Sequence, residues 1–493
     1  MRGDSLLALA VLSIGWISAS AGSRAVSDED LLPAFDPELT RAELEHHVRF
    51  LASDELRGRE AGTPDAVRAA RYLARAFERA GLEPVGTDGT FLQEVPLVRV
   101  VHEREPTLTL ETWDGTRVEG RFGIDFDVSP RAEPKVAALL ELVVVQELDE
   151  LPDAPRKDRA LWVDGSRSER RTWLGERGMG DGEGWGLCVA RGFSRERKGR
   201  RPPAPQLTRE QVEPDPADIL RLHGGLRTLL EEGEIKTVEL AYGARVDRVL
   251  DFNVVGQIAG TEPEGQGDAI VVSAHYDHIG LATAHESHGG AGSGDTDSDP
   301  AADLIFNGAD DDASGTAALL ELAETLAHGA PPARTVIFLL AAGEEKGLLG
   351  TYHYIDYPVF PLERTIANLN LEMLGRPDDL AGGAGNLWLT GFERTTLGLA
   401  FQERDLAIVP DLRPEQNFFM RSDNIAFVKQ GIVGQTLSSY NLHKDYHAVT
   451  DEASLIDFDH LFRCTKTALE ATRLLADGSV TPEWLPGGMP RVR

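Results

Sequence analysis

Five short motifs rich in histidine and carboxylate residues follow apolar runs in the second half of this 493-residue chain. In chain order they are HYDH from His275, NGADDDASG from Asn307, GEE ending at Glu345, NLEMLG around Glu372 and DYHAVTDE around His447. Each lies at the end of a predicted strand or in the loop that follows it. Because ligands bind beyond the carboxyl ends of the strands in open α/β sheets, we expect these motifs to meet at one edge of a sheet.

The apolar runs themselves predict the strands of that sheet. They are short and bounded by turn residues, which is typical of buried strands. An apolar-faced helix is predicted over residues 315–326. Strands that alternate with helices indicate an α/β fold with a doubly wound, largely parallel sheet and helices on both faces. The predicted strands cover residues 253–258, 269–274, 336–342, 366–371, 387–390 and 432–437.

Two helices are predicted near the N-terminus. Thr40 and Glu43 have the spacing of a capping box at the start of the first. Thr63 is the expected N-cap of the second, with Pro64 in its first turn and Gly81 as its stop. A polar turn, SDELRGREAG, lies between the two helices.

The sequence pattern of the chain is different between residues 106 and 247. Short alternating strands, such as 107–110, and loops rich in proline and arginine replace the α/β rhythm there. A chain of this length is also too long for one ordinary domain with a single hydrophobic core. The predicted organisation is an N-terminal part of the main domain over 22–105, an inserted mainly-β domain over 106–247, the main part over 248–480, and a tail over 481–493.

The N-terminus has the pattern of a Sec-type signal peptide over residues 1–21. Arg2 precedes an apolar run over 6–17, and the small residues 19–21 offer a cleavage site. That run is too short to span a bilayer comfortably, so no stable membrane span is expected after cleavage. The sequence therefore predicts a secreted or periplasmic protein.

Charge and cysteine content exclude other classes of protein. A formal net charge of −31 argues against nucleic-acid binding, because a phosphate backbone would be repelled. The two cysteines, Cys188 and Cys464, are too few for a disulfide framework. One bridge and two buried thiols both remain open, and the oligomeric state is not predicted.

The motifs carry the residue types of a metal centre. His275 needs a partner for its second ring nitrogen, and Asp277 is close enough in sequence to supply one. A helix cap accounts for one aspartate of the triplet 310–312 but not for three. Glu344 and Glu345 would repel each other at a buried strand end unless cations were near. One of them is expected to bind metal, while the other stays free as a general base.

Charge counting favours two metal ions over one. Two zinc ions bring four positive charges, which three ligand carboxylates and a bridging hydroxide would balance if both histidines are neutral. One ion with the same ligands would leave excess negative charge in a cleft of low dielectric constant. Nitrogen and oxygen ligands favour zinc, although cobalt or manganese would fit the same set.

These motifs resemble those of the secreted zinc aminopeptidases of the co-catalytic dizinc type. That superfamily also contains glutamate carboxypeptidase II, plasma glutamate carboxypeptidase and glutaminyl cyclase. The resemblance covers roughly residues 40–100, with FLASDELRGREAGTPDAVRAARYLA, and 250–475. It implies two Zn²⁺ per chain, with Asp311 as the ligand that bridges them. The implied ligands are His275, Asp311, Glu345, Glu372 and His447.

The same resemblance assigns the catalytic residues. Glu344 is similar to the general base of the family, and Asp277 to the acid that orients the ligand histidine. Glu372 stands where an aspartate is usual, so the carboxylate is kept on a chain one methylene longer. Asn424 stands where a histidine is frequent, and no metal role is assigned to it. His443 lacks the context that follows His447, which makes it the weaker candidate for the last ligand.

The resemblance implies an aminopeptidase that acts on peptides with a free N-terminus. A hydroxide between the two zinc ions would attack the scissile carbonyl, with Glu344 as general base. A carboxypeptidase or dipeptidase is the alternative on the same fold, and Arg376, Arg413 and Arg421 are candidates for binding the substrate carboxylate. A single-zinc enzyme like glutaminyl cyclase, and a binding protein without catalysis like the transferrin receptor, are the remaining alternatives.

Overall fold

The computed structural model describes residues 31–129, 138–145, 156–163, 187–191, 206–209, 219–261, 267–282 and 303–490, together with Pro152 and Ala154. The predicted signal peptide over 1–21 lies outside these residues and stays a prediction. Among the described residues, no helix combines the length and the apolar character needed to cross a membrane.

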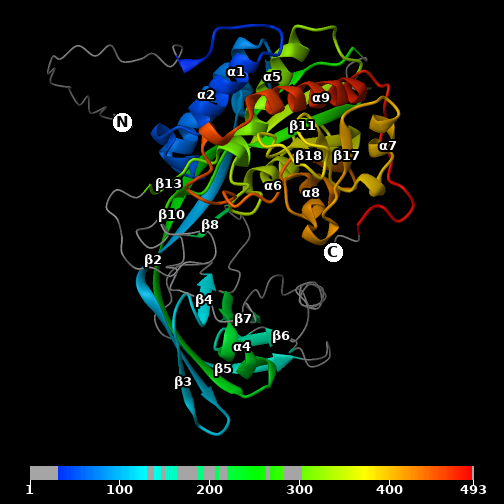
Figure 1. Ribbon diagram of the computed structural model, residues 1–493. Helices are drawn as coiled ribbons and strands as arrows, with labels where there is room; N and C mark the ends of the chain where they lie inside the picture. The colour runs from blue at the N-terminus through cyan, green and yellow to red at the C-terminus, as the bar shows by residue number, and fades with distance from the viewer. Residues whose placement is uncertain are drawn as a thin grey trace, which may run out of the picture.

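A mixed sheet forms the centre of the molecule (Figure 1). In its upper part the strand order is β17-β16-β18-β15-β11-β14-β10. The four strands β14, β11, β15 and β18 pair in parallel, whereas β10 and β16 are antiparallel to their neighbours β14 and β18. The prediction of a largely parallel sheet is therefore confirmed. The strands are β10 (Ile235–Ile258), β11 (Ala269–His275), β14 (Thr335–Ala341), β15 (Thr365–Leu371), β16 (Leu387–Leu389), β17 (Ile408–Pro410) and β18 (Val433–Ser438).

Helices cover both faces of this sheet, because its strands are apolar on both sides. Val272 and Leu340 pack into the core beneath α1, α2, α5 and α9. Their chain neighbours Val271 and Leu339 pack on the opposite face, in a cluster shared with α6 and α8. The helices are α1 (Arg41–Leu51), α2 (Pro64–Arg79), α5 (Gly315–Ala327), α6 (Leu349–Asp356), α8 (Asn424–Val428) and α9 (Phe458–Ala476).

Both predicted helix starts near the N-terminus are confirmed. The Thr40 hydroxyl oxygen accepts a hydrogen bond from the Glu43 N–H at 3.1 Å. The Thr63 hydroxyl oxygen accepts one from the Ala66 N–H at 3.3 Å. Gly81 follows α2 with a φ of 78°, the left-handed conformation that glycine adopts readily at helix ends.

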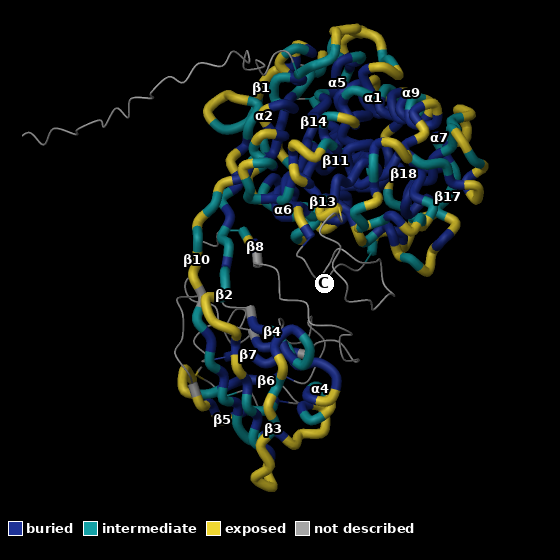
Figure 2. Tube along the Cα trace, turned by 60° about the vertical axis from the view of Figure 1, so that its left-hand side comes forward, coloured by how far each residue is buried: buried dark blue, intermediate teal, exposed yellow. Residues whose placement is uncertain are grey.

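A long two-stranded ribbon leads from this sheet to a second lobe (Figure 2). Strand β2 (Leu92–Thr112) pairs antiparallel with β10, from Leu92 opposite Val254 to Thr112 opposite Ile235. The second lobe has its own apolar cluster, which includes Phe126 and Trp162. The predicted boundaries at 106 and 247 fall within the two ribbon strands and stay a prediction. The lobe contains β3 (Arg117–Gly120), β4 (Phe126–Ser129), β5 (Ala138–Val145), β6 (Arg159–Val163), β7 (Leu187–Arg191), β9 (Ile219–Leu222) and α4 (Gly224–Glu231), and β8 (Gln206–Arg209) pairs with β2.

The two cysteines are both buried thiols and lie in different parts of the fold. Cys188 belongs to β7 of the second lobe and Cys464 to α9 of the main part. No disulfide joins these two described residues. Burial raises the pKa of the Cys464 thiol well above its ordinary value, so this thiol is unreactive toward alkylating reagents.

Three glutamates are buried where α1, α2 and α5 meet, with one arginine beside them. Arg79 lies 3.4 Å from Glu324 and 3.9 Å from Glu43. Glu321 accepts the N–H of Thr40 at 2.9 Å. Burial raises the pKa of Glu321 to about 8 and that of Glu324 to about 7. The folded state therefore holds protons here that the unfolded chain releases at lower pH.

Replacing Glu321 by glutamine is expected to stabilise the protein at alkaline pH relative to the wild type. The glutamate titrates at 4.5 when unperturbed and at about 8 in the folded chain, so wild-type stability falls as pH rises between these values. The difference in free energy of unfolding, variant minus wild type, should increase by on the order of 3 kcal/mol between about pH 5 and pH 9. Urea unfolding measures it. Glu78→Gln, exposed on α2, should show no such change. A pH-independent difference for Glu321→Gln would contradict the expectation.

Candidate metal centre

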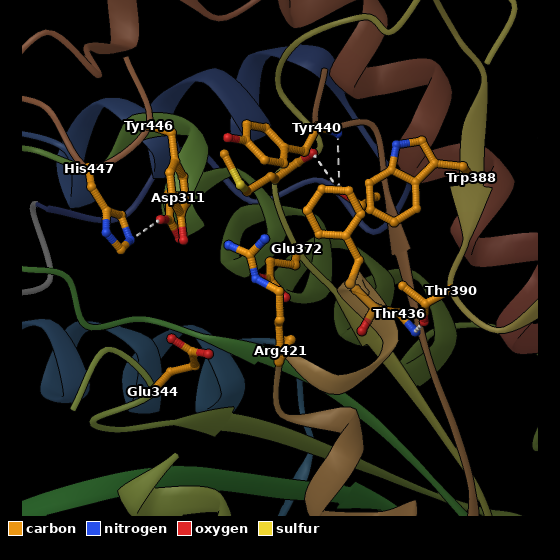
Figure 3. Close-up of a pocket in the computed structure, with 14 residues that line it drawn as sticks. Asp311, Glu344, Glu372, Trp388, Thr390, Arg421, Thr436, Tyr440, Tyr446 and His447 are labelled. Atoms are coloured by element: carbon orange, nitrogen blue, oxygen red, sulfur yellow. Dashed lines mark hydrogen bonds and ion pairs between the residues drawn. The ribbon is translucent and has the colours of Figure 1, made fainter. Parts of the chain in front are cut away.

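The predicted ligand residues meet at one edge of the sheet. His275 is the last residue of β11, Glu345 follows β14, and Glu372 directly follows β15. These three strands are parallel neighbours, so their carboxyl ends lie together. Asp311 comes from the segment before α5, and His447 comes from the loop after β18. Figure 3 shows Asp311 and His447 facing each other across one side of a pocket.

Asp311 lies between two histidines. Its Oδ1 is 3.2 Å from His275 Nε2, and its Oδ2 is 3.2 Å from His447 Nε2. Glu345 Oε2 is also 3.2 Å from His447 Nε2. Ligand atoms about 2.0 Å from a tetrahedral zinc ion lie roughly 3.3 Å from one another. These separations are therefore those expected of ligands that share a cation.

Two groups of ligand atoms share Asp311. In the first, atoms of His275, Asp311 and Glu372 lie within 4.8 Å of one another. In the second, atoms of His278, Asp311 and Glu345 meet the same limit. His278 is the last residue of the HYDH motif, and the sequence alone assigns it no role. All five predicted ligand side chains are thus brought together, with one further histidine beside them.

The electrostatics of the site suit a cation. Burial raises the pKa of Glu372 to about 7. Burial and the Asp311 charge raise the pKa of Glu345, but His278 and His447 outweigh them and lower it to about 2. Burial lowers the pKa of His447, whereas Asp311 and Glu345 raise it to about 10 overall. A bound metal would replace the protons on these histidines, so metal affinity should fall at acidic pH.

The three consecutive aspartates have three different environments. Asp310 Oδ2 lies 2.9 Å from His443 Nε2, which places His443 outside both groups of ligand atoms. Asp312 Oδ1 accepts the N–H of Gly315 at 3.0 Å, at the start of α5. The same oxygen accepts the N–H of Met373 at 2.9 Å, and the N-cap of α5 is Ser314, so Asp312 joins two main-chain segments. Asp311 is left to face the two histidines.

Asp277 links two parts of the site. His275 Nδ1 lies 3.2 Å from the main-chain carbonyl oxygen of Asp277 and 3.8 Å from its Oδ1. The same Oδ1 accepts the N–H of Glu344 at 3.0 Å. The orienting role of the Asp277 carboxylate stays a prediction. The structure adds that this carboxylate fixes the loop that carries Glu344.

Glu344 lines the same pocket as Asp311, Glu372 and His447. In Figure 3 its carboxylate points into the pocket, apart from the Asp311–His447 pair. Burial raises the pKa of Glu344 well above its ordinary value, and Glu345 and Glu372 add to this while His275 opposes it. A cation nearby would lower this pKa toward the range of a general base.

An aromatic wall extends from His447, a predicted ligand, into the pocket. Tyr446 stacks on His447 with ring centroids 3.9 Å apart, and Tyr440 lies 5.2 Å from Tyr446. Phe418 continues the row at 5.8 Å from Tyr440, and Trp388 stacks on Phe418 at 5.2 Å. The pocket contains about 500 Å³ of empty space, part of which is open to solvent. It therefore offers an apolar surface for a substrate side chain beside the candidate metal centre.

The three candidate arginines differ in their surroundings. Arg376 pairs with Asp445 at 2.7 Å, and Arg413 makes a two-pronged pair with Asp378 at 2.6 and 2.8 Å. Arg421 lines the pocket (Figure 3). Its guanidinium has no ion pair among the residues that the structure describes, so it alone of the three is placed to meet a substrate anion.

Asn424, to which no metal role was assigned from the sequence, makes hydrogen bonds through both groups of its side-chain amide. Its side-chain N–H donates to the carbonyl oxygen of Phe419 at 3.0 Å. Its Oδ1 accepts a hydrogen bond from the Thr436 hydroxyl at 3.1 Å. These bonds join the start of α8 to the preceding turn and to β18.

Arg59 is a supporting residue that the sequence analysis missed. Its side chain is fully buried and donates hydrogen bonds to four main-chain carbonyl oxygens, those of Leu51, Tyr276, Asn307 and Gly308. The last three belong to segments that carry ligand residues. Its only sequence signal was the turn SDELRGREAG, in which nothing indicates burial.

Asp451 also supports the site without entering it. Its carboxylate accepts the N–H of Asp310 at 3.0 Å and that of Asp311 at 3.1 Å. Arg376 lies 3.4 Å from the same carboxylate. Because Asp451 belongs to the DYHAVTDE motif, one loop supplies His447 and also holds the backbone of Asp311.

The family comparison covers this part of the chain. A model described as Peptidase family M28 matches residues 253–472, a segment that runs from the end of β10 into α9 and contains every predicted ligand. This segment, somewhat less than half of the chain, is therefore similar to the M28 peptidases.

Individual relatives match smaller parts. Aminopeptidase YwaD of Bacillus subtilis (strain 168) is 31% identical over 109 residues, which are 22% of this chain and 18% of the relative. The vacuolar membrane protease of Lachancea thermotolerans is 28% identical over 232 residues, 43% of this chain and 20% of the relative. The chain thus spans about a fifth of the length of these relatives.

A solved structure shares the fold of nearly the whole chain. The aminopeptidase from Aneurinibacillus sp. strain AM-1 is similar over 92% of this chain and 96% of its own, with a TM-score of 0.55 and 18% sequence identity. At that identity the likeness establishes the fold alone.

Proposed function

We propose that this protein is a zinc-dependent aminopeptidase with two zinc ions per chain. The observation that carries the proposal is the shared position of Asp311 between His275 and His447, each 3.2 Å away. The first ion would be held by His275, Asp311 and Glu372. The second would be held by Asp311 and His447 with Glu345. Imidazole and carboxylate ligands in such small groups suit zinc.

The metal ions and the residues of the chain then have different roles in the reaction. Bound zinc ions supply Lewis acidity, which makes a water more acidic and polarises the scissile carbonyl. Glu344 removes the proton from the attacking water and returns it to the departing amine, as general base and then general acid. Asp277 holds the main chain of Glu344 in place for both steps.

Two features support action at the N-terminus of peptides. Glu344 and Glu372 line the pocket, so carboxyl oxygens are available there to accept hydrogen bonds from a substrate α-amine. The aromatic wall provides apolar contact for the first side chain, and this favours large apolar N-terminal residues. The aminopeptidase names of the relatives add to this reading.

A matched set of leucyl peptides tests the proposal. The set contains one peptide with both termini free, its N-acetylated form and its C-terminally amidated form. An aminopeptidase cleaves the first and third and leaves the N-acetylated peptide intact. Equal cleavage of the N-acetylated peptide would contradict the proposal.

Arg421 is the observation that favours the second candidate, a carboxypeptidase or dipeptidase. For the aminopeptidase, Arg421→Gln is expected to leave the ratio of kcat/KM between the free and the C-terminally amidated peptide within about 3-fold of the wild-type ratio. A carboxypeptidase would lose about 10-fold or more on the free carboxylate alone, because a charged hydrogen bond contributes about 1.5–3 kcal/mol. Arg364→Gln, remote from the pocket residues, is the control.

We also propose that the protein acts outside the cytoplasm, in the periplasm or as a secreted enzyme. The support is the signal-peptide pattern of residues 1–21. N-terminal sequencing of the purified protein tests this proposal, with a mature chain that starts near Gly22 as the expected result.

A further inference from the structure

His278 is a buried histidine at the candidate metal centre that has no assigned role. It follows β11, and its side chain has no exposed surface. Its Nδ1 lies 2.8 Å from Glu345 Oε1 and 4.0 Å from Asp311 Oδ2. Among the described residues, neither this nitrogen nor Glu345 Oε1 has a partner in hydrogen-bonding geometry. Two buried polar atoms that face each other in this way are expensive unless a cation joins them.

The spacing of the two histidines fits a common cation. The ring centroids of His278 and His447 are 5.8 Å apart, with the ring planes at 73°. Two imidazoles bound to one zinc ion at about 2.0 Å have centroids roughly 5–6 Å apart, depending on the angle at the metal. Glu345 has one carboxylate oxygen 2.8 Å from His278 Nδ1 and the other 3.2 Å from His447 Nε2, whereas Asp311 Oδ2 lies 3.2 Å from His447 Nε2 and 4.0 Å from His278 Nδ1.

The backbone around His278 is built to hold the ring there. Gly308 has a φ of 56°, and a Cβ on it would lie 2.5 Å from His278 Cγ, so glycine is required at this position. The His278 N–H donates to the carbonyl oxygen of Arg59 at 3.4 Å. Arg59 in turn binds the carbonyl oxygen of Gly308, which joins the two segments that enclose the ring.

We propose that His278 Nδ1 is a fourth protein ligand of the second zinc ion, together with Asp311, Glu345 and His447. The inference rests on the proposed function. The two ions then differ. The second ion has four protein ligands. The first, with His275, Asp311 and Glu372, keeps an open position, which is typical of a catalytic zinc site.

Cobalt titration of the metal-free protein tests the ligand directly in the variant His278→Cys. A thiolate that binds Co²⁺ gives a sulfur-to-cobalt charge-transfer absorption, and this band should appear with one of the two cobalt equivalents. His47→Cys is the matched control, because His47 is equally buried but contacts Tyr72 on α2 instead. It should show no band. Absence of the band in His278→Cys would overturn the proposal.

Zinc affinity separates a ligand from a residue that only positions Glu345. Loss of a residue that only hydrogen-bonds to a ligand typically lowers zinc affinity roughly 10–100-fold. His278→Ala should lower the affinity of one zinc site by more than this, and the affinity of the other site should stay within about 3-fold of the wild-type value. His278→Asn, which keeps a hydrogen-bond donor, should not restore it. Restoration by asparagine, or unchanged affinity in His278→Ala, would overturn the inference while the two-zinc proposal stands. A wild-type chain that binds neither zinc nor cobalt would overturn both.

Discussion

The variant Glu344→Gln is expected to bind two zinc ions and to have almost no turnover. Glutamine has nearly the same shape as glutamate but does not accept a proton at neutral pH. Loss of general acid–base catalysis typically costs about 10²–10⁴-fold in kcat. Asp277 holds the main-chain N–H of residue 344, a contact that the substitution leaves in place. The measurement is kcat on a free leucyl peptide, with zinc content per chain determined on the same sample.

The adjacent glutamate provides the matched control for this variant. Glu345 Oε2 lies 3.2 Å from His447 Nε2, so Glu345→Gln should weaken zinc binding at the second site. Adding excess zinc should restore the activity of this variant. Excess zinc should not restore Glu344→Gln. Turnover near the wild-type value in Glu344→Gln would show that Glu344 is not the base.

The variant Arg59→Met is expected to lose about 3–5 kcal/mol of folding free energy, the typical cost of removing one partner from a buried charged network. The guanidinium donates to four carbonyl oxygens, and methionine would remove this donor from all of them. The Gly308 oxygen would keep the N–H of Ala313 at 3.3 Å, whereas those of Leu51, Tyr276 and Asn307 would lose their side-chain partner. Burial lowers the pKa of Arg59 to about 10, while nearby aspartates, among them Asp277 and Asp311, raise it. The arginine thus also offsets negative charge beneath the site. Urea unfolding of the metal-free protein measures the loss.

Two further variants keep this expectation testable even if Arg59→Met does not fold. Arg59→Lys retains the charge but not the planar fork of donors, so its loss should be intermediate. Arg68→Met removes an exposed arginine that pairs with Glu55 on the surface, and should change stability by at most about 1 kcal/mol. Equal stability of Arg59→Lys and the wild type would contradict the role given to the four hydrogen bonds.

The strands of the main sheet were predictable because their local pattern determines them. Apolar runs such as 269–274 and 336–342 are buried on both faces, and the strands β11 and β14 have nearly those bounds. The ribbon of β2 and β10 was not foreseen. In this ribbon Leu92 pairs with Val254. Residues so far apart along the chain have no local sequence pattern that predicts their pairing.

Some residues of the site could likewise be predicted from the sequence, and others could not. The convergence of His275 and Glu372 was predictable, because polar residues at the carboxyl ends of buried parallel strands lie together. Asp311, which precedes α5, was indicated by the aspartate triplet and by the family resemblance. The supporting residues were not predictable. Arg59 lies in a polar turn and looks like a surface residue, although its partners are main-chain carbonyl groups 217 and 248 positions away along the chain. His278 stands in a quoted motif, but only the structure shows its nitrogen against Glu345.

The two outer aspartates show why composition alone misleads. Asp310, Asp311 and Asp312 are equivalent as a triplet in the sequence, and all three are buried. Their partners separate them, because His443 and the helix start at Gly315 take the outer two. The sequence shows that such a triplet is unusual. Only the neighbouring groups in the fold determine which of the three carboxylates can reach a metal.

The most direct test of the two-zinc aminopeptidase is a zinc titration of the metal-free protein, followed by hydrolysis of a free leucyl peptide and its N-acetylated form. We predict that two equivalents of zinc bind per chain, that full activity is reached at the second equivalent, and that only the free peptide is cleaved. A chain that binds no zinc, or that cleaves both peptides equally, would contradict the proposed function.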